Sequence, residues 1–182
     1  MHRCYRWAAH EKGGLEHLEL DESGGAIAAE GVVIGVDDAD KPFGCRYAIR
    51  CDAYWHVRRV EVRVAGRASL LLESDGEGNW SDAQGRPQPA LAGCIDVDLT
   101  CTPFTNTLPL RRLGPRLRQR HTITVAYVDV PALAVEPSQQ AYTWLGPGRY
   151  LFESLSNRFS AEIETDVDGL VLRYPGLFSR DR

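Results

Sequence analysis

Residues 93–113 hold the densest group of side chains that could do chemistry. Asp96 and Asp98 form a D-x-D pair, and Arg111 and Arg112 follow near the end of the same segment. Residues two apart on a β-strand share a face, so the two carboxylates would lie about 7 Å apart. Such a pair could act as acid and base or hold a divalent ion if its face were enclosed. The alternative is an exposed acidic face that pairs with the two arginines.

A stiff polar turn lies inside this segment. Thr105, Asn106 and Thr107 stand between Pro103 and Pro109. Prolines fix φ and remove backbone donors, so the path of the chain is restricted here. Threonine and asparagine side chains in such a path either cap nearby backbone groups or face a ligand.

A short basic strip follows, and it contains no acidic residue. Its members are Arg111, Arg112, Arg116, Arg118 and Arg120. A guanidinium group binds phosphate or carboxylate through two parallel hydrogen bonds. The strip therefore predicts either contact with an anionic lipid head group, a nucleotide or a membrane surface, or a solvated loop neutralised by acidic strands.

Aromatic side chains near expected strand ends are further candidates for a binding site. Trp55 and Trp80 are examples, next to predicted turns. Aromatic faces pack on apolar CH groups while their polar atoms form hydrogen bonds, so they could line a lipid or carbohydrate cavity. Packing in the core is the alternative.

Motifs for metals and cofactors are missing from the sequence. The five cysteines include no C-x-x-C pair, and the five histidines include no H-E-x-x-H pattern. There is also no G-x-S-x-G, G-x-G-x-x-G or P-loop. We therefore predict no disulfide framework, no metal site and no cofactor.

Composition limits the class of protein. The chain has 182 residues, 43% of them hydrophobic, which predicts one globular domain over residues 1–182. Lys and Arg number 21 against 25 Asp and Glu, for a net charge of -4, which argues against nucleic acid as a partner. No apolar run is long enough to span a bilayer. The N-terminus lacks the apolar stretch of a signal peptide, so we expect a cytoplasmic protein.

The elements that must position these side chains are mostly strands. Alternation of apolar and polar residues predicts strands that bury one face, at 15–20, 26–34, 44–52, 57–64, 68–74, 95–99, 121–128, 149–155, 158–164 and 170–174. Turn residues at 75–78 and 166–169 predict hairpins. The best helical candidate is 131–141, which Pro137 weakens. These patterns predict a mostly antiparallel β fold, as a roll, barrel or sandwich.

Nearly the whole chain, residues 5–180, resembles a bacterial family that carries the name "putative glycolipid-binding proteins". The resemblance rests on Cys51-Asp52-Ala53, Trp55, Arg58, Asp75-Gly76, Gly78, Trp80, Asp82, Gly85, Pro87, Gly93-Cys94, Asp96–Leu99, Thr102–Pro109, Arg111–Leu113, Val125–Val128 and Tyr174–Phe178. It implies a spiral β-roll, which is a single curled antiparallel sheet with few or no helices. It also implies a shape similar to periplasmic lipoprotein carriers.

Our leading hypothesis is a non-enzymatic protein that holds a lipid or glycolipid against the concave face of a curled sheet. The predicted ligand-binding residues are Asp96, Asp98, Thr105, Asn106, Thr107, Arg111, Arg112, Trp55, Arg58 and Trp80. One alternative is an enzyme for a small anionic or sugar substrate, in which Asp96 and Asp98 act with Arg111 and Arg112. Another is an interaction module that forms a homodimer through its sheet.

Overall fold

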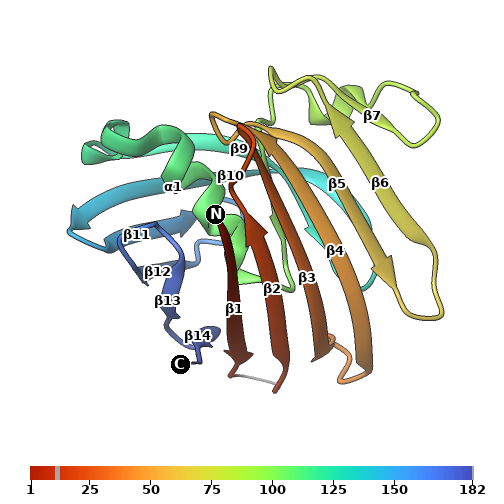
Figure 1. The fold of residues 1–182 in the computed structure, drawn as a ribbon, viewed down its shortest axis with the longest axis horizontal. Coiled ribbons are helices and arrows are strands. Elements are labelled where there is room, and N and C mark those ends of the chain that lie inside the picture. The colour runs from red at the N-terminus through yellow and green to blue at the C-terminus, as the bar shows by residue number, and fades with distance from the viewer. Residues whose placement is uncertain (11–12, 182) are drawn as a thin grey trace.

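The computed structural model describes residues 1–10 and 13–181 and folds them into one sheet of 14 strands (Figure 1). The strands are β1 (His2–Ala9), β2 (Leu15–Asp21), β3 (Ala26–Val36), β4 (Pro42–Asp52), β5 (Val57–Val64), β6 (Ser69–Ser74), β7 (Trp80–Asp82), β8 (Asp96–Leu99), β9 (His121–Asp129), β10 (Ala134–Gly146), β11 (Arg149–Ser154), β12 (Ser160–Thr165), β13 (Val171–Tyr174) and β14 (Phe178–Arg180). Their order in the sheet is β7-β6-β5-β4-β3-β2-β1-β14-β13-β12-β11-β10-β9-β8. The sheet curls strongly but does not close, because β7 and β8 remain its edges. The predicted curled β fold is confirmed.

Alternation of residue types explains why these segments form strands. In β5, Val60, Val62 and Val64 are buried on one face while Arg59 and Arg63 are exposed on the other. β-branched residues fit a pleated surface that is half buried. The observed bounds of β5 are the predicted ones, 57–64.

Both predicted hairpins are present, and their turns use the expected chemistry. Asp166 Oδ1 accepts hydrogen bonds from the backbone N–H groups of Asp168 and Leu170, at 3.0 and 2.9 Å. Gly169 in the same turn has φ of +81°, a conformation that favours glycine. The other hairpin, between β6 and β7, closes with a hydrogen bond from Asp75 N to Asn79 O.

The chain forms two meanders that meet at its termini. Strands β1 to β7 neighbour one another in chain order, and so do β9 to β14. β1 pairs with β14, so Trp7 lies opposite Arg180. β8 departs from the pattern because it pairs in parallel with β9, with Asp96 opposite Val125. Parallel neighbours need a crossover connection, which residues 100–120 supply.

This crossover packs on the inner face of the curled sheet. It contains the 3₁₀ helices η2 (Pro103–Asn106) and η3 (Gly114–Arg118) and the helix α1 (Thr107–Leu113). Phe104 and Leu108 join a core cluster formed mainly by the first meander, whereas Leu110, Leu113 and Leu117 join a cluster formed by the second. The crossover therefore links the cores of the two meanders.

Local signals set the limits of the crossover. The Thr102 hydroxyl accepts a hydrogen bond from Phe104 N at 3.0 Å, and Pro103 stands at the first helical position. Gly114 ends α1 with φ of +51°. α1 has seven residues, and no helix in the described part of the chain is long and apolar enough to cross a membrane.

The helical candidate at 131–141 is wrong, because residues 134–146 form β10. Pro137 pairs with Ala126 of β9, whereas the pairing of β10 with β11 starts only at Gln140. Pro137 thus lies in the part of β10 that pairs with β9 alone, so one side of the strand has no strand partner there. Such an edge position tolerates a residue without a backbone N–H. The helix forms at 107–113 instead, and its first residue is the last of the predicted polar turn at 105–107.

Candidate functional site

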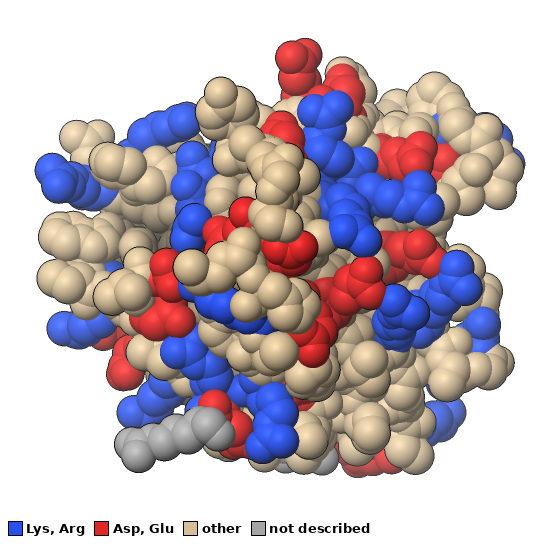
Figure 2. Space-filling view, viewed as in Figure 1, with Lys and Arg blue, Asp and Glu red and all other residues tan. Residues whose placement is uncertain are grey.

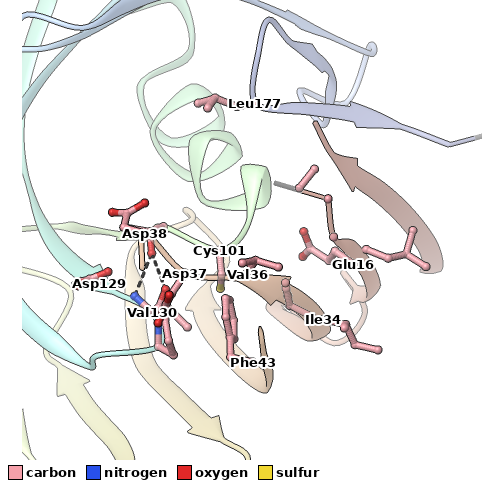
Figure 3. Close-up of a pocket in the computed structure, with 18 of the residues that line it drawn as sticks. Glu16, Ile34, Val36, Asp37, Asp38, Phe43, Cys101, Asp129, Val130 and Leu177 are labelled. Carbon is pink, nitrogen blue, oxygen red and sulfur yellow. Dashed lines mark hydrogen bonds between the residues drawn. The ribbon is translucent and has the colours of Figure 1, made fainter. Parts of the chain in front are cut away.

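A cavity of about 470 Å³ lies at the end of the curl where hairpin turns meet (Figure 3). Its lining includes Gly13 and Gly14 ahead of β2, Arg67 between β5 and β6, and residues of the turns between β3 and β4, β9 and β10, and β13 and β14. Its size falls within the range of cavities that hold small ligands, about 300–1,000 Å³.

The wall of this cavity combines apolar residues with Asp37, Asp38, Arg67 and Asp129. Trp7, Val33 and Phe43 line it. Leu15 and Ile34, a cross-strand pair of β2 and β3, also line it and are 46% and 66% exposed.

One buried acid, Glu16 of β2, lines the cavity. The Tyr47 hydroxyl donates to Glu16 Oε1, and the Thr102 hydroxyl donates to the same oxygen at 2.7 Å. Glu16 Oε2 is buried and has no hydrogen-bond partner among the described residues. Burial raises the pKa of Glu16 to about 7, although both hydrogen bonds act to lower it. Near neutral pH this carboxyl is therefore partly protonated, and its Oε2 makes no hydrogen bond with the described residues.

The hydroxyl of Tyr47 reaches Glu16 because a glycine lies beneath its ring. Gly31 of β3 is the cross-strand partner of Tyr47 of β4. A Cβ atom at Gly31 would overlap the Tyr47 ring. The glycine thus lets the ring lie flat across β3, with its hydroxyl at Glu16.

Cys101 also lines the cavity. A hydrogen bond with Cys45, together with burial, raises the pKa of the Cys101 thiol well above its usual value. The thiol therefore stays protonated and forms part of the apolar wall, since nucleophilic attack requires the thiolate.

Three of the predicted ligand-binding residues line a different cavity, of about 410 Å³. They are Trp55, Arg111 and Arg112, and Arg116 lies there as well. The Arg111 guanidinium lies 4.6 Å from the centre of the Trp55 ring, a cation–π contact. The structure therefore brings together one predicted aromatic residue and part of the basic strip.

Acidic residues already pair with most of that strip. Arg112 forms a bidentate ion pair with the buried Asp96, at 3.0 and 2.5 Å. Arg111 Nη2 lies 3.1 Å from Glu22 Oε1, and Arg120 Nε lies 2.8 Å from Glu153 Oε2. Positive and negative side chains are also interspersed over the face shown in Figure 2.

The predicted polar turn lies inside the protein. The Thr105 hydroxyl donates to Asp98 Oδ1 at 3.0 Å, and Asn106 Oδ1 accepts from the Tyr142 hydroxyl at 3.0 Å. The Thr107 hydroxyl donates to the carbonyl oxygen of Gly169 at 2.9 Å. These side chains are buried and satisfy polar groups of the crossover and its neighbours.

Asp98 has partners of its own, and its pKa is raised by burial. Gln140 Nε2 donates to its Oδ2 at 2.6 Å. Its neighbour in the D-x-D pair, Asp96, is bound to Arg112 instead. The two carboxylates thus hold separate internal partners.

The remaining predicted residues lie apart from the cavity at the hairpin end. Trp80 is buried in the core, where its Nε1 donates to the carbonyl oxygen of Cys94 at 2.7 Å. Arg58 lies on the surface, with its Nη1 3.6 Å from Asp52 Oδ2.

Comparison with known proteins identifies the family. The model of a family described as "Putative glycolipid-binding" matches residues 4–180. The chain belongs to this family. A DUF1089 family protein from Pseudomonas aeruginosa, known from its crystal structure, is similar to this chain. The two sequences are 39% identical, the structures match with a TM-score of 0.84, and the match covers 92% of each chain. No curated protein is significantly similar to the chain.

In this member of the family, the cavity at the hairpin end was not predicted from the sequence. A signal for Glu16 was present, because Glu16, Leu18 and Leu20 alternate along the buried face of β2. An acidic residue in the register of core positions marks a buried polar site. The rest of the lining comes from turns that are far apart in the chain, and no local pattern connects them.

Proposed function

We propose that the chain binds a lipid or glycolipid in the cavity at the hairpin end. The observation that carries this proposal is Glu16 Oε2, a buried carboxyl oxygen without a partner among the described residues, in a cavity whose wall includes Trp7, Val33 and Phe43. A buried polar atom without a partner costs about 1–3 kcal/mol, and a hydroxyl or carbonyl group of a ligand would remove that cost.

The arrangement of the lining suggests how the ligand lies. Its polar group meets Glu16, and its apolar part lies along Trp7, Val33 and Phe43 toward the Leu15–Ile34 rim. The crossover occupies much of the inner face of the sheet, so we place the ligand at one end of the curl rather than along its whole concave face.

Displacement of a fluorescent acyl-chain probe by n-octyl glucoside tests this placement. We expect the full chain to bind the probe and n-octyl glucoside to displace it. In Glu16→Leu the apolar cavity remains but the polar contact is lost, so the affinity for n-octyl glucoside should fall about tenfold, the loss of roughly one hydrogen bond.

Arg116→Ala is the matched control, because Arg116 lies on the surface at the other cavity. It should leave the affinity for n-octyl glucoside unchanged. The proposal fails if the native chain binds neither compound. It also fails if Arg116→Ala weakens binding and Glu16→Leu does not.

A further inference from the structure

The outer face of β1 and β2 gathers side chains that typically bind metals. His2 and Cys4 lie two apart on β1, and His17 and Glu19 lie two apart on β2. Alternate residues of a strand share a face. The register places Cys4 directly opposite Glu19, so two pairs that are distant in the sequence meet across the strands.

The side chains are already in contact. His2 Nε2 lies 2.5 Å from Glu19 Oε2, and Cys4 Sγ donates to that same oxygen at 3.1 Å. The ligand atoms of these three residues all lie within 4.8 Å of one another. His17 Nε2 lies 2.7 Å from the other carboxyl oxygen of Glu19.

We propose that His2, Cys4 and Glu19 bind one Zn²⁺ ion, with water as the fourth ligand and His17 holding the Glu19 carboxylate in place. Zinc bonds of about 2.0–2.3 Å put tetrahedral ligands roughly 3.3–3.8 Å apart, so these exposed side chains need only small rotations. Carboxylates that bind metals are in turn held by hydrogen bonds, and the His17 ring is placed to make one to Glu19.

The chemistry of the ligands selects the metal. Thiolate and imidazole ligands favour zinc, whereas magnesium and calcium prefer sets made of oxygen alone. The Cys4 thiol must release its proton to the solvent when the metal–sulfur bond forms, so zinc affinity should increase as the pH rises.

Such an ion would join β1 to β2 on the outer surface. The inward neighbours Leu18 and Leu20 pack in the core beneath it. This site is separate from the cavity at the hairpin end and does not depend on lipid binding. Sequence spacing alone did not reveal it, because its ligands alternate on two strands instead of following a helical motif.

Titration of the full, untagged chain with Zn²⁺, and with Co²⁺ as a spectroscopic probe, tests the site. We expect one ion per chain, with visible d–d bands of tetrahedral Co²⁺ and a sulfur-to-cobalt charge-transfer band. Cys4→Ser should abolish the charge-transfer band and weaken zinc binding more than about 100-fold. His17→Ala should weaken it about 10–100-fold, as expected for a residue that orients a ligand.

His121→Ala is the matched control, a histidine on β9 outside the cluster. It should leave zinc affinity and the cobalt spectrum unchanged. The four other cysteines are buried, so the charge-transfer band reports on Cys4. The proposal is overturned if zinc does not bind, if Cys4→Ser keeps the native affinity, or if His121→Ala weakens binding as much as Cys4→Ser does.

Discussion

Glu16 is the residue on which the binding site depends. Its carboxyl is held between a tyrosine and a threonine on one oxygen, while the other oxygen has no partner among the described residues. A buried acid whose pKa is near neutral can serve as hydrogen-bond donor or acceptor, depending on its protonation. Such a group suits recognition of hydroxyl and ester oxygens of a ligand whose apolar part packs on Trp7, Val33 and Phe43.

The first prediction concerns the pH dependence of stability. The pKa of Glu16 is raised from 4.5 to about 7 on folding, so the folded state binds the proton more tightly than the unfolded state. The contribution of Glu16 to the free energy of unfolding is therefore fully present below about pH 4.5. It is lost as the pH rises to about 7, by roughly 3 kcal/mol.

Denaturant unfolding of the native chain and of Glu16→Gln at about pH 5 and about pH 8 checks this prediction. The amide does not titrate, so Glu16→Gln should lose this part of the pH dependence. Equal pH dependence in the two proteins would show that Glu16 is ionised throughout this range.

The residue types alone predicted no residue that lines the cavity at the hairpin end, and the predicted residues that do meet lie at the other cavity. Trp55, Arg111 and Arg112 do gather at one cavity. The polar turn at 105–107 proved to be internal, because each of its side chains finds a partner on another element. Pairing across elements depends on tertiary structure, and spacing along the chain does not contain it.

At the scale of elements, the crossover from Pro103 to Arg118 is the most informative part of the fold. It carries the apolar residues that connect the two core clusters. It also carries Arg112, which neutralises Asp96 on the edge strand β8. The segment that contains the predicted polar turn is therefore part of the core and packs against the sheet.

The second prediction concerns this ion pair. Arg112→Ala leaves the fully buried carboxylate of Asp96 without its partner, which should reduce the free energy of unfolding by about 3–5 kcal/mol. Arg118→Ala, an exposed position of the same crossover, should change it by less than about 0.5 kcal/mol. Urea denaturation measures both, and a similar small effect of the two substitutions would contradict the role given to Arg112.

Periodicity predicted most strands but not all of them. β5 was predicted with its observed bounds because valine alternates with charge. β1 was not predicted, because Arg3 lies in register with the inward Tyr5 and Trp7. Arg3 is accommodated there by ion pairs with Glu22 and Asp168, which come from other parts of the chain.

At the scale of the whole molecule, curling creates the cavity. A flat sheet would keep the turns on either side of the β1–β14 contact apart, whereas the curl brings β3–β4 and β9–β10 turns around one space. The family match agrees with a binding role. The edges of the sheet, β7 and β8, have only three and four residues, which limits pairing with another chain.

The central claim is that the cavity at the hairpin end holds a lipid. Native mass spectrometry of the full chain, purified gently from cells, tests it most directly. We expect a lipid adduct on the native chain. Ala132→Trp, an exposed position lining the cavity, should lose it, whereas Ala83→Trp, exposed in the turn after β7, should keep it. A native chain without adduct, or an adduct that persists in Ala132→Trp, would contradict the account.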